Sequence, residues 1–365
     1  MKLNVKILVA IVYMAAVYIV SGCSSETKIK YSLPEYEEDI SASFETMTDE
    51  LVGLEYIRDI YCYGPYIIVI SVSLKDWTLI HVFDKDTGVR LFDVLNRGRG
   101  PGEYLYDRNC RFNGTDGTMR IYDQFKGGIL DFQIDSLLKN GTKAIKEKAL
   151  ETETSGVEKI FDYNGRNLVI KNASFIGNDS LYTVRFSLYD DNGKILAQYN
   201  KYPHIENEKL RWQLYMSTHA ALSPDCKKLA VSSYYNGILE TYSLEDDSIR
   251  NIAVGYFFKP DFHYDGGIIY TDNTRNGFSD LFATNDMIYS SFDCETNLKL
   301  HEEMPAGQRP LLNTDICIFN WNGRPLKRIR TDYTIARLCI DEDAGVLYAV
   351  VKDRQMRSYL GRINL

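Results

Sequence analysis

Residues 219–233 read HAALSPDCKKLAVSS, and this stretch decides the fold. Apolar and polar residues alternate on either side of a turn-forming segment centred on Asp225, which is the pattern of a β-hairpin. A second hairpin follows almost at once, because YSLEDDSIRNI (residues 242–252) again places acidic turn residues between two alternating runs. Two hairpins in succession predict one four-stranded antiparallel unit.

The first hairpin pattern, an alternating strand, a tight turn and a second strand, recurs along the chain at intervals of roughly 50 to 60 residues. Its turns centre near Gly64, Asp116, Asn164, Asp225, Asn285 and Asp343. A second hairpin follows most copies, as in FDKDTGVRLFDV (residues 83–94), YDDNGKILAQY (residues 189–199) and FNWNGRPLKRI (residues 319–329). About six four-stranded units therefore fill the chain. Repeats of this size and strand number predict an all-β fold, a six-bladed β-propeller, since radial closure protects the edges of the sheets.

The ends of the repeat array indicate how the ring closes. The final unit stops at GRINL (residues 361–365), one strand short of four, so the ring needs a strand from elsewhere. The segment around residues 41–54 is the candidate donor, and we expect the propeller to span residues 41–365. Period-2 alternation excludes helical repeats. The nearest helical candidate, residues 135–150, could form a short helix or a charged hairpin.

Three segments resemble the TolB-like family of six-bladed propellers. Two of them, SPDCKKLAVSSYYNGILETYSL (residues 223–244) and GFSDLFATNDMIYSSFD (residues 277–293), resemble blade phrases of that family. The third, RGRGPGEY (residues 97–104), resembles a GxGPGE signature of lipid-anchored propellers from Bacteroidetes. The resemblance implies a six-bladed propeller in a family whose function is largely unassigned. One departure is Cys226, which stands where the turn glycine is expected, so we expect a tightened or strained hairpin there.

The N-terminus has the features of an export signal. Lys2 and Lys6 precede an apolar run of roughly 14 residues, too short to cross a bilayer as a helix. Small residues directly before Cys23 resemble a bacterial lipobox, in which that cysteine is acylated; the alternative is an ordinary signal peptide with a chance cysteine. We expect residues 1–22 to be a lipoprotein signal peptide, Cys23 the lipid attachment site and residues 23–40 a flexible tether.

The predicted location is the cell envelope. Ser24 and Ser25 offer no inner-membrane retention residue, which favours the outer membrane, with either face open. The chain carries a net charge of −8 with dispersed Lys and Arg, and this argues against nucleic-acid binding, which depends on neutralising phosphates. Free buried thiols are the simplest interpretation of the other six cysteines, although the sequence leaves their pairing open: Cys62, Cys110, Cys226, Cys294, Cys317 and Cys339.

The octet RGRGPGEY raises the question of a phosphate-binding loop. A dinucleotide fingerprint fails because Glu103 occupies the third glycine position, and no Gly-Lys-Ser/Thr follows for a P-loop. We therefore expect no nucleotide. In the repeat frame the octet joins the first unit to the second and forms a corner, built by four residues that suit an unusual backbone: Gly98, Gly100, Pro101 and Gly102.

The charged residues of the octet leave two interpretations open. Arg97, Arg99 and Glu103 could pair with one another and serve only the corner. They could instead face the mouth of the central channel and contact a carboxylate or another anion of a partner.

Candidate chemistry elsewhere is sparse. The five histidines lack zinc spacing, and no G-x-S-x-G nucleophile motif is present. His219 is better explained as a core histidine than as a catalytic one. Some six-bladed propellers are metal-dependent lactonases, and acidic residues near the starts of inner strands keep that alternative open: Glu55, Asp59, Asp162 and Asp280.

Two long insertions, residues 200–217 and 294–313, exceed ordinary hairpin loops, and such loops often carry recognition. Arg211, Trp212 and Tyr215 could stack on a sugar or anchor a protein partner, or could pack on the propeller rim. The sequence thus favours a lipid-anchored binding module for an envelope protein or glycan, with no cofactor and no catalytic residue. The alternative is a hydrolase or lactonase that uses a divalent cation in the channel.

Overall fold

The computed structural model describes residues 29–365 except 52–53, 55, 73–77, 106–108, 124, 150–156, 172–183, 191, 208–209, 246–247, 266–267, 293 and 303–310. The predicted signal peptide, Cys23, the first part of the predicted tether and Glu55 lie outside the described residues. Residues 31–365 group as one unit by their contacts.

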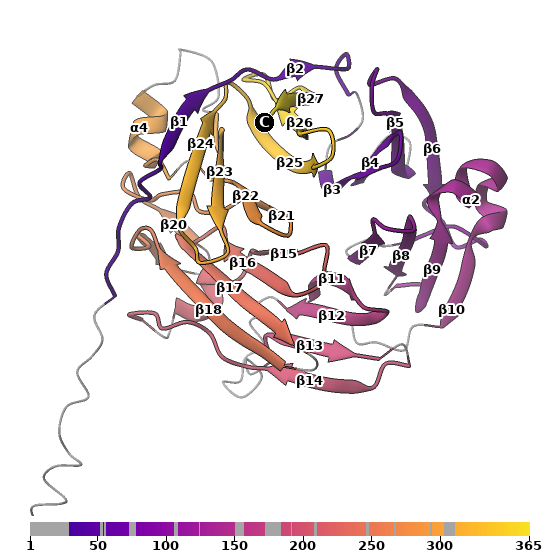
Figure 1. The fold of residues 1–365 in the computed structure, drawn as a ribbon, viewed down its shortest axis with the longest axis horizontal. Helices are drawn as coiled ribbons and strands as arrows, with labels where there is room; N and C mark the ends of the chain where they lie inside the picture. The colour runs from indigo at the N-terminus through magenta and orange to yellow at the C-terminus, as the bar shows by residue number, and fades with distance from the viewer. Residues whose placement is uncertain are drawn as a thin grey trace, which may run out of the picture. The chain divides into compact units, whose positions relative to one another are not determined.

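Six sheets stand as blades around a central axis, and each blade contains four antiparallel strands, as predicted (Figure 1). Blade 1 consists of β3 (Tyr56–Tyr63), β4 (Tyr66–Val72), β5 (Thr78–Asp84) and β6 (Arg90–Asn96). Blade 2 consists of β7 (Asn109–Asn113), β8 (Thr118–Asp123), β9 (Gly128–Gln133) and β10 (Lys146–Ala149). Blade 3 consists of β11 (Val157–Tyr163), β12 (Arg166–Lys171), β13 (Phe186–Tyr189) and β14 (Ile195–Tyr199).

The second half of the ring follows the same plan. Blade 4 consists of β15 (Thr218–Leu222), β16 (Lys228–Ser233), β17 (Ile238–Glu245) and β18 (Ser248–Tyr256). Blade 5 consists of β21 (Asp280–Ala283), β22 (Met287–Ser291), β23 (Asp315–Asn320) and β24 (Pro325–Arg330), and blade 6 of β25 (Thr334–Asp341), β26 (Val346–Lys352), β27 (Ser358–Asn364) and β2 (Glu45–Thr46). The connections carry α3 (Arg211–Leu214), β19 (Phe262–Tyr264), β20 (Ile268–Tyr270) and α4 (Asn297–Glu302).

Each of the six predicted turns joins the first and second strands of a blade, so the repeat frame is confirmed. Of the two alternatives predicted for residues 135–150, the structure has the short helix, and a single strand follows it in place of a hairpin. The segment begins within α2 (Ile134–Asn140), continues through a short 3-10 turn, η1 (Gly141–Ala144), and ends in β10, the outermost strand of blade 2. No helix in the described part of the chain is long and apolar enough to cross a membrane.

The N-terminal strand β2 closes the ring, as the missing fourth strand predicted. It pairs antiparallel with β27, with Glu45 opposite Arg362 and Thr46 opposite Gly361. The Arg362 guanidinium donates two hydrogen bonds of 2.8 Å to the Glu45 carboxylate. Beyond β2, the Met47 amide donates to the Leu360 carbonyl at 2.8 Å, which extends the contact between the chain's two ends.

The prediction of a flexible tether up to residue 40 is wrong for residues 31–40. These residues lie along the outer edges of blades 4 and 5, where β1 (Glu38–Ser41) pairs parallel with β24. The Tyr36 hydroxyl donates to the Cys317 sulfur at 3.0 Å, and the Ser32 amide donates to the Tyr256 carbonyl at 3.0 Å. The segment looks polar because β1 is exposed along its whole length, so it lacks the alternating pattern of a half-buried strand.

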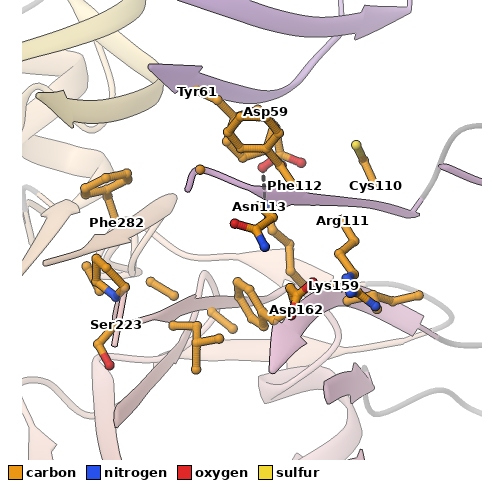
Figure 2. A pocket seen from close by; sticks show the side chains of 18 of the residues that line it. Asp59, Tyr61, Cys110, Arg111, Phe112, Asn113, Lys159, Asp162, Ser223 and Phe282 are labelled. Carbon is orange, nitrogen blue, oxygen red and sulfur yellow. Dashed lines mark hydrogen bonds and ion pairs between the residues drawn. The ribbon is translucent and has the colours of Figure 1, made fainter. Parts of the chain in front are cut away.

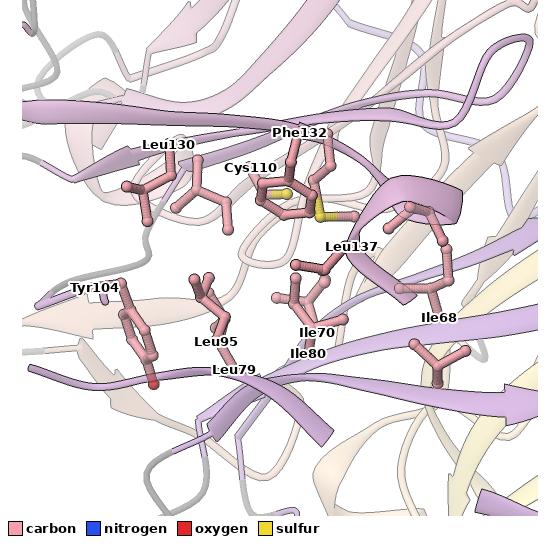
Figure 3. Packing of buried hydrophobic residues seen from close by; sticks show 14 residues of the cluster. Ile68, Ile70, Leu79, Ile80, Leu95, Tyr104, Cys110, Leu130, Phe132 and Leu137 are labelled. Carbon is pink, nitrogen blue, oxygen red and sulfur yellow. The ribbon is translucent and has the colours of Figure 1, made fainter. Parts of the chain in front are cut away.

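The hydrophobic core lies between neighbouring blades. Figure 3 shows the interface of blades 1 and 2, where Leu79, Ile80 and Leu95 of blade 1 face Leu130 and Phe132 of blade 2. Comparable clusters fill the interfaces of blades 4 and 5, 5 and 6, and 6 and 1. The packing between blades holds the ring together. Side chains on the inner strands are therefore available to line the central channel.

Candidate functional site

The first strands of all six blades line one central pocket with a volume of about 780 Å³ (Figure 2). These inner strands are β3, β7, β11, β15, β21 and β25. The turns that follow β7, β11 and β15 also contribute to its wall. A pocket of this size suits a small molecule or one segment of a larger ligand.

Three carboxylates from the predicted acidic set reach this pocket, and each lies beside a basic side chain. Asp59 on β3 forms an ion pair with Lys159 on β11. Asp162 on β11 accepts a hydrogen bond from the Arg111 guanidinium on β7, and Arg111 is itself buried.

The third carboxylate, Asp280, lies 3.9 Å from the Arg337 guanidinium, measured from Oδ1 to Nε. Its Oδ2 accepts a hydrogen bond of 2.9 Å from the Leu338 amide. Burial raises the pKa of Asp280 to about 6, although Arg337 and Lys159 act in the opposite direction. Burial also lowers the pKa of His219 to about 3, so this histidine is a neutral imidazole at physiological pH.

Aromatic rings form the other part of the lining. The rings of Tyr61 and Phe112 lie 4.6 Å apart between centroids at a tilt of 34°. Phe161 and Phe282 also line the pocket and are half-buried, so part of each ring is accessible. The Lys159 ammonium lies 5.9 Å from the centroid of the Tyr61 ring. The pocket therefore combines aromatic faces with three carboxylates that each lie beside a basic side chain.

The donor set does not fit a divalent cation. Asp59, Asp162 and Asp280 stand on different inner strands, and each is engaged by a lysine or an arginine. Among the residues that the structure describes, no group of three His, Cys, Asp or Glu side chains is arranged to hold a metal ion. The arrangement can instead present hydrogen-bonding groups and ring faces to a ligand without a large net charge.

The octet RGRGPGEY lies away from this pocket, at the junction of blades 1 and 2. None of Arg97, Arg99 and Glu103 lines the pocket, so of the two interpretations left open, the one that places them at the channel mouth gains no support from it. Arg97 and Arg99 are exposed, whereas the Glu103 carboxylate folds back and accepts a hydrogen bond of 2.6 Å from the Gly100 amide. A methyl group at Gly98 would lie 2.0 Å from Glu103 Oε2. The absence of a side chain at Gly98 therefore leaves the space that the Glu103 carboxylate occupies.

Blade 2 holds the octet from the other side. The Lys126 ammonium donates to the Gly100 carbonyl at 2.8 Å and to the Glu103 carbonyl at 3.1 Å. Gly102 has a φ of +69°, the left-handed region, and its amide donates to the Glu147 carboxylate. These contacts account for the glycines as parts of a corner, and Pro101 is exposed beside them. Whether Arg97 and Arg99 also contact a partner stays a prediction.

The aromatic loop at residues 200–217 packs onto blade 4. Tyr215 is only 1% exposed, so its ring presents no face to a partner, in line with the alternative that this residue packs against the propeller. Trp212 is half-buried against an apolar cluster that includes Tyr215 and Leu214. The half-buried Arg211 guanidinium lies 5.4 Å from the centroid of the Tyr202 ring. In the second insertion, residues 303–310 lie outside the described part of the chain.

The basic pocket residues Arg111, Lys159 and Arg337 were not predicted. A signal for them exists in three of the six copies of the repeat, because the first strands of blades 2, 3 and 6 each contain one basic residue: CRF, EKI and ARL. Detecting it requires the copies to be aligned with one another, so that equivalent positions can be compared across blades.

Residues 67–343 match the family model described as TolB-like 6-blade propeller-like. The chain belongs to the TolB-like six-bladed propeller family. Among curated proteins, none matches the sequence.

Solved structures share the fold of this TolB-like chain at low sequence identity. A protein of Bacteroides fragilis described as exported is 11% identical, with a TM-score of 0.53, over 90% of this chain and 99% of its own. A DUF4221 family member from Bacteroides vulgatus is 9% identical, with a TM-score of 0.51, over 93% and 98%. The WD40 repeats of RRP9 are 10% identical, with a TM-score of 0.52, over 91% and 100%. At these identities the likeness shows the fold alone.

Proposed function

We propose that this protein is a lipid-anchored binding module of the bacterial envelope, and that its central pocket binds a glycan. The observation that carries the proposal is the lining of the pocket of about 780 Å³, in which accessible aromatic rings stand beside carboxylates neutralised by basic side chains. Such a pocket suits an uncharged ligand rich in hydroxyl groups. Each hydroxyl can donate to a carboxylate or accept from an amide or a guanidinium.

The aromatic faces support a sugar over a charged ligand. The apolar face of a pyranose ring packs on an aromatic ring, and Phe112, Phe161 and Phe282 each keep part of their surface accessible. Asn113, which follows Phe112 on β7, adds a neutral polar side chain to the lining (Figure 2). A strongly anionic or cationic ligand would instead compete with the existing ion pairs and would have to separate them.

The envelope location rests on the N-terminus. The lipobox-like sequence before Cys23 and the GxGPGE resemblance support acylation and an outer-membrane position. Residues 31–41 run along the outer edges of blades 4 and 5, and none of them lines the pocket. Residues 31–41 therefore take no part in the proposed binding site.

The decisive test is saccharide binding by the mature protein. Fragments of envelope polysaccharides would be screened on an array, and hits would be measured by calorimetry. Phe112→Ala should weaken binding by about tenfold, since loss of one stacked ring removes on the order of 1.4 kcal/mol. A variant with both Arg97→Ala and Arg99→Ala is the matched control and should bind normally, because both residues are exposed outside the pocket.

Three other outcomes would overturn parts of this proposal. Equal binding by the wild type and Phe112→Ala would place the site elsewhere. A crosslinked protein partner lost in the Arg97 and Arg99 variant would favour protein recognition at the octet. Hydrolysis of a lactone or ester that requires an added divalent cation would favour the enzymatic alternative.

A further inference from the structure

The junction of the first and last blades brings together two cysteines that are 277 positions apart in the sequence. Cys62 lies on β3 of blade 1 and Cys339 on β25 of blade 6, and their sulfur atoms are 3.1 Å apart. Both are thiols in this structure. Each strand is hydrogen-bonded within its own blade, where Cys62 lies opposite Ile67 and Cys339 opposite Tyr348.

We propose that Cys62 and Cys339 form a disulfide bond that covalently closes the propeller ring when the protein meets a disulfide donor. A disulfide bond brings its sulfur atoms to about 2 Å, so the two thiols need to approach by about 1 Å. The side chains already face one another across the seam between the blades.

The surroundings of the two thiols differ and set the order of reaction. Cys62 is half-buried and lines the central pocket, so a small disulfide donor can reach it. Cys339 is fully buried. Burial raises the pKa of the Cys339 thiol, since the thiolate loses its solvation, with further contributions from Cys62 and Asp280. Cys62 is therefore the thiol that reacts first.

The chemistry balances with one equivalent of disulfide donor. The Cys62 thiolate attacks the donor, forms a mixed disulfide and releases one donor thiol. Cys339 then loses its proton to solvent while its sulfur attacks Cys62, and the second donor thiol leaves. The two cysteines lose two electrons and two protons in total, and the donor disulfide is reduced to two thiols.

The position of the bond gives it a structural consequence. The seam of blades 6 and 1 is where the two ends of the chain meet, and strand pairing there relies on the two-residue strand β2. An apolar cluster and a Lys85–Asp341 ion pair with a Nζ–Oδ2 distance of 2.6 Å already join these blades. A crosslink between Cys62 and Cys339 would enclose most of the chain in one loop, which strongly restricts the unfolded state.

The test begins with the mature protein, purified in reduced form and then exposed to oxidised glutathione. Peptide mass spectrometry without reduction should find residues 62 and 339 in one crosslinked peptide pair, lighter by two hydrogen atoms than the reduced peptides. Oxidation should raise Tm by about 5 °C or more in the wild type. The Cys62→Ser and Cys339→Ser variants should lose this rise, whereas Cys226→Ser, at a half-buried turn position on another blade, should keep it.

Two results would overturn the proposal. Full alkylation of both thiols after oxidation, under denaturing conditions, would show that the bond does not form. A stable glutathione adduct on Cys62 would show that Cys339 cannot resolve it. The same mapping on protein recovered from its native envelope tests whether the bond forms in the cell. Because the glutathione experiment is independent of location, its failure is distinguishable from failure of the envelope assignment.

Discussion

A buried ion pair between blades 3 and 4 provides the sharpest prediction about stability. The Arg185 side chain is 1% exposed and Glu240 is fully buried, and their two contacts are 2.5 Å and 2.6 Å long. The Arg185 guanidinium also donates to the Tyr242 hydroxyl at 2.9 Å. Burial alone would lower the pKa of Arg185, but the Glu240 carboxylate outweighs it and keeps the pKa well above its ordinary value.

Arg185→Met should lower the free energy of unfolding by about 3–5 kcal/mol, because it leaves the Glu240 carboxylate buried without a partner. The double variant with Glu240→Met removes both charges, so it should recover at least about 2 kcal/mol of that loss. The Arg185 guanidinium also lies 4.7 Å from the centroid of the Tyr202 ring and 4.9 Å from that of Tyr215. Loss of this contact should therefore loosen the loop at residues 200–217.

Urea unfolding of the wild type, both single variants and the double variant forms a complete thermodynamic cycle. Limited proteolysis reports separately on the loop, with cleavage expected within residues 200–217 of Arg185→Met before global unfolding. Glu245→Met is the matched control, since Glu245 is an exposed carboxylate at the end of the same strand as Glu240. The reasoning fails if Arg185→Met costs less than about 1 kcal/mol, or if the double variant loses the sum of the single losses.

Three further changes have expected outcomes. Cys226 occupies the left-handed region with a φ of +58°, as its place in a glycine turn predicted, so Cys226→Gly should raise stability by about 0.5–1 kcal/mol in urea unfolding. Gly98→Ala must displace the Glu103 carboxylate from the Gly100 amide, so it and Glu103→Ala should each cost about 1–2 kcal/mol, with a double variant no worse than either. Additive losses would contradict this coupling. Asp280→Asn should stabilise the protein by about 2–3 kcal/mol above pH 6, because the raised pKa of Asp280 makes its ionised form unfavourable in the folded state. The gain should fade as the pH falls from about 6 to 4, since both proteins are then neutral at this position; a constant gain would refute the titration.

The sequence predicted the features of the fold that depend on neighbouring residues. Alternation and turn residues are local, so the six turns and the number of blades could be read directly from the chain. Closure by an N-terminal strand followed from counting strands in the final unit, and β2 lies within the segment that was expected to supply it. Residues 31–40 escaped detection because β1 is exposed and is held by ion pairs, such as that of Asp39 with Arg328, which leave no apolar alternation in the sequence.

The pocket was harder to predict, because its contacts join blades that are distant in the sequence. Asp59 was a candidate on its own, but its partner Lys159 is 100 positions away on blade 3. The pairing of each acid with a base changes the chemistry that the acids can perform. Unpaired carboxylates would favour a cation site, whereas paired ones favour a neutral polar ligand. Residue type alone cannot distinguish these two cases.

The glycine-rich octet RGRGPGEY also shows that residue type alone does not identify a binding site. Its composition resembles a ligand-binding loop, yet the Glu103 carboxylate and the Gly100 amide bond to one another. The Glu147 carboxylate accepts a hydrogen bond from the Gly102 amide. The amides of Gly100 and Gly102, two donors of the kind that bind anions, are therefore engaged within the protein. Arg97 and Arg99 are exposed at this corner. A distinctive motif can therefore mark a demanding corner of the backbone, while the residues that form the candidate site are spread over the inner strands of all six blades.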